Sequence, residues 1–313
     1  MWKLKAIIQK ICGIVPFGTH LNYFFQKHIT KGVVLSDFFF EDVLTHFKAL
    51  QQQLHDRDAT YSLKNKRVLE IGTGWHPIMG IAFYLSGAEL CYTADLKNHL
   101  KANNFITSIR FFVRYAEQGL LQHFLPDIQQ DRLEKLKSLL VANQNYSTTQ
   151  LAEQVHLKQI IGNLCKPELV PEELDLVFSI NTLEHIDKNE LPLLFSNLKQ
   201  RIKTPGHFQL HTLGMFDHFI HVDKSIHRLN YLRFSAQQWK WIDNSIQPQN
   251  RLRITDFIQL FETTGYEVIG RIVRMFENAP LPFTPHPEFN TYPVADLLVP
   301  YSSVLLVAKH KAI

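Results

Sequence analysis

The run RVLEIGTGWHPIMG (67–80) constrains this chain more than any other feature of its sequence. An apolar stretch that carries one carboxylate, Glu70, leads directly into Gly-Thr-Gly, and a helix-like apolar segment with Pro77 near its first turn follows. A second apolar stretch, ELCYTAD, ends at Asp95. Strand, helix and strand within about thirty residues predict a βαβ unit, in which the two strands pair in parallel.

The same alternation continues along the chain. Further strands are predicted in the segments KQIIGNLC, LDLVFSIN, HFQLHTLG, YEVIGRIVRM and SSVLLVAKH, with helices between most of them. Seven strands interleaved with helices predict a doubly wound α/β fold, that is, a seven-stranded, mostly parallel, Rossmann-like sheet. No long helix joins the last two strands, so we expect the last strand to run antiparallel to its neighbours.

The predicted domain boundaries follow a change near residue 60, where a helical pattern gives way to alternating strands and helices. Residues 1–60 are expected to form a helical N-terminal extension, in which Ser36 or Asp37 caps the second helix. Residues 61–313 are expected to form the α/β domain. Residues 97–157 are too long for an ordinary α/β connection and predict a helical insertion. Residues 215–250 predict a long loop on the side of the substrate.

The first helix has two interpretations. Its large aliphatic residues recur at helical spacing, and a helix that packs them onto the domain is the simpler expectation; these residues are Leu4, Ile7, Ile8, Ile11, Ile14 and Val15. The alternative is an interfacial helix that gives peripheral membrane contact, with Lys3, Lys5 and Lys10 facing lipid head groups.

Composition excludes several classes of protein. The formal net charge is only +4, and no Lys/Arg tract of five or more occurs in the 313 residues, so no nucleic-acid partner is expected. Three widely spaced cysteines indicate a reducing compartment rather than a disulfide or zinc framework. No apolar run approaches the length of a membrane span, and no signal peptide is clear. We therefore expect a cytoplasmic protein.

A carboxylate inside a buried parallel strand needs a partner, because burying a charge without one is costly. Glu70 lies beside Gly72 and Gly74, which let the backbone approach a ligand closely, and the helix near Pro77 offers free N–H groups to an anion. Asp95 follows Gly72 by 23 residues, a position suited to binding the two hydroxyls of a ribose. These residues predict a nucleoside ligand that carries an anionic group.

Two ligand chemistries compete for this site. The dinucleotide fingerprint G-x-G-x-x-G requires a third glycine at position 77, where this chain has Pro77. That departure weakens a nicotinamide or flavin interpretation. S-adenosylmethionine is the alternative, because it carries a carboxylate in place of a pyrophosphate, together with a cationic amine and a sulfonium.

With these motifs in place, the sequence resembles the class I S-adenosylmethionine-dependent methyltransferases, in their type-11-like branch. VLEIGTG is similar to the family's first motif, LDLVFSINTLEHI to its fourth-strand segment, and KTPGHFQLHTLG to its fifth strand with the preceding turn. The resemblance covers roughly residues 66–94 and 160–264 and implies the fold, the activity and the cofactor of that family.

The resemblance also implies roles for individual residues. Glu70, Gly72, Thr73 and Gly74 would hold the methionine end of the donor, and Asp95 its ribose. The adenine would lie between Asn163 and Leu164, and the donor methyl near Ser179, Ile180 and Asn181. His185 is expected to pack beside the sheet and stabilise the following helix rather than to act in catalysis.

The acceptor side is predicted in the segment that follows the fifth strand, which holds His211, Asp217, His218, His221, Asp223 and His227. Methyl transfer needs a base only if the acceptor must lose a proton, and histidine suits that task. We expect His218 to be the base and Asp217 to orient it. The spacing matches no specific metal motif, so no metal is expected, and the cluster is expected to line the acceptor pocket with hydrogen-bonding groups.

The acceptor itself is not encoded in a motif. We expect methyl transfer to an oxygen or nitrogen of a small molecule or of a glycan- or lipid-linked precursor. Two other classes remain: a regulatory protein that binds S-adenosylmethionine without turnover, and a Rossmann oxidoreductase. Calorimetry with S-adenosylmethionine and NAD separates the ligand classes, and incubation with labelled donor separates the enzyme from the regulator.

Overall fold

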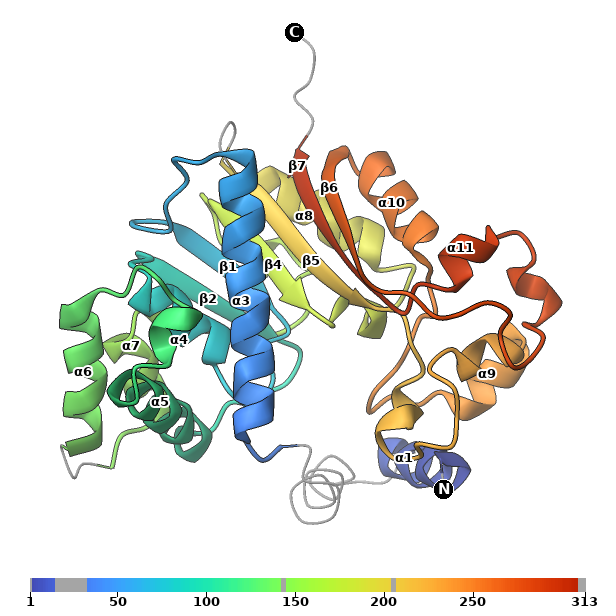
Figure 1. Cartoon of the computed structure of the whole chain (residues 1–313), viewed down its shortest axis with the longest axis horizontal. Helices are drawn as coiled ribbons and strands as arrows, with labels where there is room; N and C mark the ends of the chain where they lie inside the picture. Colours follow the sequence, from blue (N-terminus) through green and yellow to red (C-terminus); the bar gives the residue numbers. More distant parts are fainter. Residues whose placement is uncertain (1, 15–32, 142–144, 204–206, 309–313) are drawn as a thin grey trace, which may run out of the picture. The chain divides into compact units, whose positions relative to one another are not determined.

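The computed structural model describes residues 2–14, 33–141, 145–203 and 207–308. Its strands form one seven-stranded sheet in the order β3-β2-β1-β4-β5-β7-β6 (Figure 1). The doubly wound α/β fold is thereby confirmed. The strands are β1 Arg67–Ile71, β2 Leu90–Asp95, β3 Leu157–Ile161, β4 Leu176–Ile180, β5 Phe208–Gly214, β6 Tyr266–Met275 and β7 Tyr301–Ala308.

The first four strands pair in parallel, as the βαβ pattern predicts. In the register of β1 with β2, Glu70 is opposite Thr93, and in that of β1 with β4 it is opposite Phe178. The helix α4 (Ile78–Leu85) connects β1 to β2, and all of its residues are buried. Its apolar sequence reflects this burial, because a helix inside a layered α/β protein has little surface to give to solvent.

The last strand runs antiparallel to its neighbours, as expected. The N–H of Met215, just after β5, donates to the carbonyl of Pro300, just before β7. The N–H of Glu277, just after β6, likewise donates to the carbonyl of Leu298. The ends of β5 and β6 therefore each lie beside the start of β7. β7 runs antiparallel to both strands, which makes the sheet mixed.

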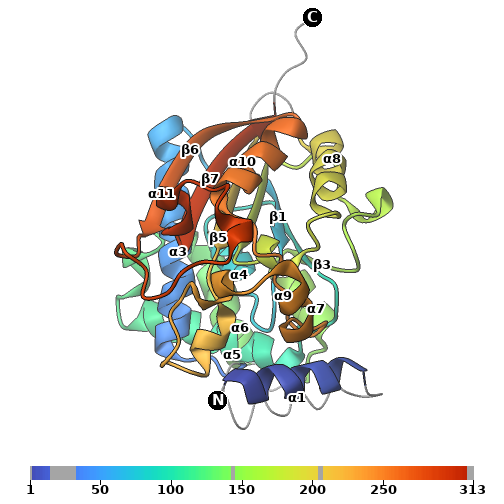
Figure 2. The same ribbon diagram turned by 90° about the vertical axis from the view of Figure 1, so that its right-hand side faces the viewer.

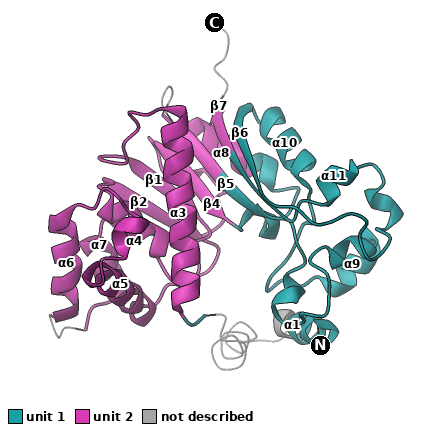
Figure 3. Ribbon diagram, in the orientation of Figure 1, with its two compact units in different colours: residues 1–34, 181–193, 211–304 teal, residues 35–180, 194–210, 305–313 magenta. Residues whose placement is uncertain are grey.

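The chain divides into two compact units, shown in Figure 3. Unit 1 contains residues 1–34, 181–193 and 211–304, and unit 2 contains residues 35–180, 194–210 and 305–313. This division differs from the predicted boundary at residue 60, because the second N-terminal helix belongs to the unit of the first strands. The further α-helices are α1 Trp2–Ile14, α3 Asp37–Arg57, α5 Ala102–Glu117, α6 Gln130–Val141, α7 Thr148–Gln154, α8 Leu191–Arg201, α9 Ala236–Ile242, α10 Ile254–Thr263 and α11 Val294–Leu297.

In unit 2, α3 has the predicted cap and buries one apolar stripe. The Ser36 side chain accepts a hydrogen bond from the N–H of Phe39. The ring of Phe47 meets that of Phe83 on α4 edge to face, with centroids 5.0 Å apart. The buried apolar residues of the helix are Phe40, Leu44, Phe47, Leu50 and Leu54.

The segment between β2 and β3 is helical, as predicted, and it packs on unit 2. Leu133, Leu136 and Leu139 of α6 are buried. The guanidinium of Arg132 donates to the carbonyls of Tyr84 and Ala88, both at 2.7 Å, which fixes α6 to the end of α4. The insertion is therefore a layer of unit 2 that is tied to its buried helix.

In unit 1, α1 packs against α9 and the 3-10 helix η4 (His218–His221) (Figure 2). The prediction that its large aliphatic residues face inward is wrong: Leu4, Ile7 and Ile11 are 63%, 58% and 53% exposed. Small and polar residues occupy the inner face instead, and these are Ala6 and Gln9. The side chains of Ile14 and Val15 lie outside the described residues.

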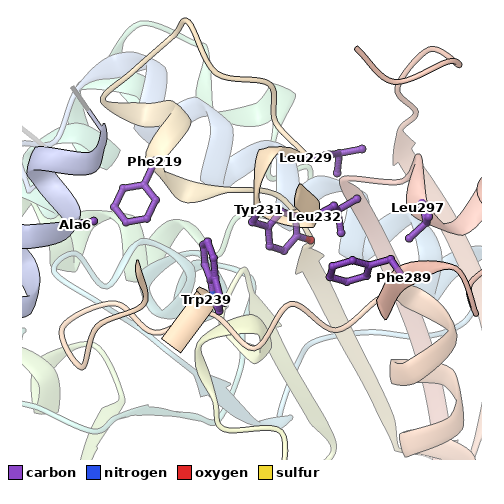
Figure 4. Close-up of a cluster of buried hydrophobic side chains, with 8 residues drawn as sticks. All are labelled: Ala6, Phe219, Leu229, Tyr231, Leu232, Trp239, Phe289 and Leu297. Atoms are coloured by element: carbon purple, nitrogen blue, oxygen red, sulfur yellow. The ribbon is translucent and has the colours of Figure 1, made fainter. Parts of the chain in front are cut away.

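The inner face of α1 joins a cluster of buried aromatic and aliphatic side chains in unit 1. Figure 4 shows this cluster, in which Ala6 lies among the buried residues of unit 1. The Trp2 ring packs 5.6 Å from that of Phe219, and Lys10 donates to the carbonyls of Lys240 and Trp241. These contacts orient α1 by its ends and its one alanine, and the aliphatic stripe consequently faces outward.

Candidate active site

The glycine turn after β1 is held to the tip of β2. The N–H of Gly72 donates to the carbonyl of Ala94 at 2.8 Å, and the N–H of Gly74 donates to the Asp95 carboxylate at 3.1 Å. Both glycines have positive φ, 85° and 69°, a conformation that side chains disfavour. A Cβ added at Gly74 would meet open space, so the turn leaves room above its backbone.

Glu70 is only 6% exposed and its carboxylate accepts a hydrogen bond from the Thr73 hydroxyl at 3.1 Å. Burial raises the pKa of Glu70 to about 8, the Thr73 hydrogen bond lowers it, and the negative charge of Asp95 raises it further. Two acids thus lie close together around the turn, and a cation between them would relieve both burial and repulsion. This arrangement explains why the strand carries a carboxylate.

Asp95 lies beside the glycines, as the sequence interpretation requires. One carboxylate oxygen accepts the N–H of Gly74, and the other is 3.8 Å from Nε2 of His99. The His99 ring packs against Trp75, with centroids 4.4 Å apart. The carboxylate therefore stands at the end of β2 between the turn and a pair of rings.

Asn163 and Leu164 follow β3 at the same edge of unit 2. The N–H of Gly162 donates to the carbonyl of Asp95 at 2.9 Å, which ties the two strand ends together. The Asn163 side chain accepts the N–H of Cys165 at 2.9 Å, and Asn197 of α8 donates to the carbonyl of Leu164. Polar contacts thus fix this segment at a position that can border the adenine ring of a nucleoside.

Ser179 and Asn181 mark the end of β4. Ser179 is fully buried and pairs with Ile71 in the register of the two strands. Asn181 has φ of +48°, where the chain turns out of the sheet, and its side chain donates to the Tyr301 hydroxyl within unit 1. The strained turn fixes the direction in which the following residues leave the sheet.

These features of unit 2 fit S-adenosylmethionine. Its ammonium and sulfonium would compensate Glu70 and Asp95, and its nucleoside would meet the strand tips that carry Asp95 and Asn163. The open, positive-φ backbone at Gly74 leaves space for close approach of the ligand. The chemistry that the donor supplies is a methyl group already activated by the positive sulfur.

On the acceptor side, the structure corrects the expected role of Asp217. Its carboxylate caps η4 by accepting the N–H of Phe219, and its other oxygen accepts from Asn230. The ring nitrogen Nδ1 of His218 lies 3.3 Å from the side-chain amide of Gln247 instead. Among the described residues, Gln247 rather than Asp217 is therefore the neighbour that orients the His218 ring.

Most of the remaining histidines and acids are engaged in local structure. The Asp223 carboxylate accepts the N–H of Trp2 at 3.1 Å and the Ser225 hydroxyl at 2.6 Å. His211 is fully buried in β5, and burial lowers its pKa to about 3, so it is uncharged. His227 accepts the N–H of Leu229. Asp223 and His227 therefore have structural contacts of their own, and a lining of the acceptor pocket by this segment stays a prediction.

The sequence interpretation missed Glu184, which lies beside His218. The 3-10 helix η3 (Leu183–His185) directly follows β4 and buries this glutamate, leaving 3% of it exposed. Its carboxylate is 4.0 Å from Nε2 of His218, and His185 packs its ring 4.8 Å from the same histidine. An adjacent acid and histidine immediately after a strand was the available signal, but their convergence with His218 is a tertiary feature.

Three ligand-capable groups thus meet in unit 1. One atom each from Glu184, His185 and His218 lies within 4.8 Å of the other two. Among the described residues of unit 1, these three form a group whose placement permits binding of a metal ion.

Comparison with known proteins gives the family. The model of the family described as "Methyltransferase domain" matches residues 44–270, which is more than two thirds of the chain. No curated protein matches this chain. No helix among the described residues is both long and apolar enough to span a membrane.

The chain is also similar to solved structures, among them the following two. Magnesium protoporphyrin IX methyltransferase from Synechocystis PCC 6803, with bound SAH, is 14% identical over 84% of this chain and 83% of its own, with a TM-score of 0.41. An S-adenosylmethionine dependent methyltransferase from Mesorhizobium loti is 12% identical over 80% of this chain and 94% of its own, with a TM-score of 0.42.

The family match spans the glycine turn, the acid at the tip of β2 and the segment after β4. Pro77 stands where a dinucleotide fingerprint would have its third glycine, and the acids around the turn suit a cationic donor. The chain belongs to the methyltransferase-domain family and is a class I S-adenosylmethionine-dependent methyltransferase.

Proposed function

We propose that this methyltransferase transfers the donor methyl group to an oxygen or nitrogen of a small molecule or of a glycan- or lipid-linked precursor. The observation that carries the proposal is the convergence of Glu184 and His218 in unit 1. Both are buried and both offer atoms without a hydrogen-bond partner among the residues described. Such groups are suited to an acceptor that must lose a proton during transfer.

In this proposal the donor is held by the residues around the glycine turn. Glu70 and Thr73 meet the methionine end, Gly72 and Gly74 allow close approach, and Asp95 binds the ribose hydroxyls. Asn163 and Leu164 flank the adenine, while Ser179 and Asn181 border the methyl group. The donor is already activated, so the protein mainly aligns donor and acceptor and excludes water.

His218 is the proposed acceptor-side catalytic residue. Burial and the nearby charges of His185, His221 and Lys5 lower its pKa well below the ordinary value, so the ring is neutral at physiological pH. A neutral ring keeps one nitrogen lone pair for the reaction. Asp217 contributes by capping η4, which positions His218, rather than by contacting its ring.

Within the proposed acceptor classes, α1 favours a lipid-linked one. The helix exposes an apolar stripe of Leu4, Ile7, Ile8 and Ile11, carries three lysines and has no acid. Apolar residues flanked by positive charge complement an anionic lipid surface. Lys3 is exposed beside the stripe, whereas Lys10 is engaged with the carbonyls of Lys240 and Trp241.

The test uses radiolabelled donor, the purified full-length chain, and extracts separated into aqueous and lipid fractions. Label should appear in an acceptor only with active protein, and in the lipid fraction if the acceptor is lipid-linked. Label confined to the aqueous fraction would identify a small soluble acceptor. Tight donor binding with no transfer to either fraction would indicate a regulator without turnover.

A further inference from the structure

Glu184 is a buried carboxylate whose partners are missing from the described part of the chain. Neither of its oxygens makes a hydrogen bond there. The N–H groups of Glu184 itself and of Gly214 approach the carboxylate and favour its charged form in part, but their geometry falls short of a hydrogen bond. A buried acid left in this state needs an explanation, and a bound water or ion is the usual one.

Gly214, the last residue of β5, makes this position possible. A Cβ added there would overlap Oε1 of Glu184. Any residue with a side chain would therefore push the carboxylate away from its place beside His218. Gly214 does not adopt a positive φ, so its backbone conformation does not require a glycine. Its close packing against the Glu184 carboxylate explains the glycine instead.

Each of the two histidines has a nitrogen that can hold a lone pair for a cation. Nδ1 of His185 lies 2.6 Å from the carbonyl oxygen of Pro248, which can only accept, so Nδ1 carries the proton and Nε2 keeps its lone pair. Nε2 of His218 has no hydrogen-bond partner in the described chain and lies 4.0 Å from Oε1 of Glu184.

The tautomer of His218 depends on Gln247. In the structure the amide nitrogen of Gln247 lies 3.3 Å from Nδ1 of His218. When the amide turns its oxygen toward Nδ1 instead, Nδ1 carries the proton and Nε2 is free to bind a cation. The two orientations of a glutamine amide occupy the same space, so the hydrogen-bond network decides between them. A ring N–H donated to a carbonyl or amide oxygen is the usual support of a metal-binding histidine.

One short segment holds both sides of the cluster in place. Asn250 donates to the carbonyls of Leu183 and Ile186, and its own N–H donates to the carbonyl of Glu184, all between 2.8 and 2.9 Å. Gln249 accepts the N–H of His218 and donates to the carbonyl of Phe216. The backbones that carry the three ligand-capable side chains are thus fixed before any ligand arrives.

We propose that Glu184, His185 and His218 bind a divalent metal ion of the zinc class. Two imidazoles and one carboxylate form a donor set that suits Zn²⁺, whereas Mg²⁺ prefers six oxygen ligands. Metal–ligand bonds of about 2.0–2.2 Å require the side chains to close by a fraction of an ångström to an ångström from the distances seen here. Three protein ligands leave a fourth position open, as catalytic zinc sites do.

This inference rests on the proposed function and changes the role of His218 from base to metal ligand. An acceptor hydroxyl in the open position would lose its proton to water more easily, because the metal stabilises the resulting alkoxide. The alkoxide oxygen then forms a bond to the donor methyl carbon as the carbon–sulfur bond breaks. The electron pair stays on sulfur, which becomes the neutral thioether of S-adenosylhomocysteine.

The cluster also has a route to solvent. His218 is one wall of a small cavity in unit 1 that Lys5, Gln247 and Trp239 also line. The imidazole is 11% exposed, compared with 4% for the Glu184 side chain. A metal ion or the polar end of an acceptor can therefore approach the cluster from the side of His218.

The experiment titrates Zn²⁺ into the full-length protein after treatment with a chelator, by calorimetry and by metal analysis after desalting. Wild type should bind one zinc per chain. Glu184→Gln, which keeps the shape of the side chain, and His218→Ala should each weaken zinc binding at least about 100-fold, as loss of a ligand exceeds the loss of an outer hydrogen bond. The matched control is His221→Ala, because this histidine neighbours His218 but lies outside the cluster.

Thermal unfolding provides a second measurement that does not depend on the acceptor. Zn²⁺ should raise the Tm of wild type and of His221→Ala, and should leave that of Glu184→Gln unchanged. Zinc binding that is absent from wild type, or equal in wild type and Glu184→Gln, would overturn the inference.

Methyl transfer separates this inference from the proposed function. Chelator-treated enzyme should lose transfer and regain it with Zn²⁺. Full transfer by metal-free enzyme would refute the role of the metal in activating the acceptor and leave His218 as a base. Stoichiometric zinc binding without transfer to any acceptor would leave the metal site standing and refute the proposed function.

Discussion

Two buried glutamates, Glu70 of β1 in unit 2 and Glu184 of η3 in unit 1, differ in their surroundings. Burial raises the pKa of each to about 8. Glu70 accepts a hydrogen bond from Thr73 and has a second acid, Asp95, beside it. Glu184 lies beside two histidines. Under the two proposals above, the same kind of buried acid binds an organic cation in one unit and a metal ion in the other.

The pair of acids in unit 2 favours an organic cation. A donor with its own hydrogen-bonding ammonium and diffuse sulfonium charge matches carboxylates that stand around an open glycine turn. The acid with two imidazoles in unit 1 favours a metal ion, because each of the three groups offers one atom toward a common point. Each prediction below tests one side of this contrast.

The largest effect is expected from His218→Ala. Methyl transfer should fall about 100-fold or more, since the acceptor loses the group that activates it. The affinity for S-adenosylmethionine should stay within about threefold, because the change lies outside the glycine turn. Single-turnover rates and calorimetry measure the two quantities. A variant that keeps its rate would remove His218 from the mechanism.

Asp95→Asn should affect binding of the donor rather than the acceptor side. Loss of a charged acceptor for the ribose hydroxyls should weaken donor binding by about 10- to 100-fold, as hydrogen bonds to charged groups contribute about 1.5–3 kcal/mol. Zinc binding at Glu184 should be unchanged. Calorimetry with donor and with Zn²⁺ checks both expectations, and a donor affinity equal to that of wild type would contradict the assignment of Asp95.

Glu70→Gln should reveal the raised pKa. The folded state holds the Glu70 proton more tightly than the unfolded chain, in which the pKa is about 4.5. This residue therefore costs stability as pH rises from about 4.5 to about 8, and the variant should gain free energy of unfolding over wild type at pH 9 but not at pH 4. Urea unfolding at the two pH values measures this difference.

The same variant sharpens the contrast for the donor. Binding a cation should drive a proton from Glu70, so donor affinity of wild type should rise between pH 6.5 and pH 8.5. In Glu70→Gln the affinity should be lower at pH 8.5 and its rise with pH smaller. Calorimetry in buffers of different ionisation enthalpy detects the released proton. A slope that is equal in the two proteins would contradict a role for Glu70 in holding the cation.

The smallest effect is expected from α1. Replacing Ile7 and Ile11 by serine should weaken binding to anionic vesicles several-fold, because each exposed side chain would otherwise bury apolar surface in the interface. Tm should be nearly unchanged, since both residues are more than half exposed. Val294→Ser, at an exposed apolar site of the same unit, is the control. Sedimentation with vesicles measures the binding, and equal binding by the Ile7/Ile11 variant would exclude this surface.

Much of the fold followed from local patterns. The βαβ unit, the seven strands, the helical insertion and the Ser36 cap all depend on residues close together in the chain, and the structure has them. The position of Asp95 beside Gly74 followed as well, because parallel neighbours place their carboxyl ends at the same edge of a sheet. Topology therefore made this part of the proposed donor site predictable.

The acceptor side was not predictable in the same way. The sequence placed Asp217 next to His218, but adjacent side chains in a 3-10 turn point in different directions, and Gln247 took the expected position. The sequence interpretation gave Glu184 no role, and only the tertiary structure brings η3 and η4 together so that Glu184 lies beside His218. Such convergence depends on contacts between residues that are far apart in the chain, 29 positions for His218 and Gln247.

The sequence by itself determined the family, the donor and the layered α/β architecture, because strand and helix periods and a glycine turn are written in consecutive residues. Only the tertiary structure decided which face of α1 is buried and which groups surround Glu184. Burial is set by what a segment packs against: Trp2 and Ala6 pack on a cluster of buried aromatic and aliphatic side chains, and the more apolar stripe of α1 faces outward. Local periodicity states that a helix has two faces, and long-range packing chooses between them.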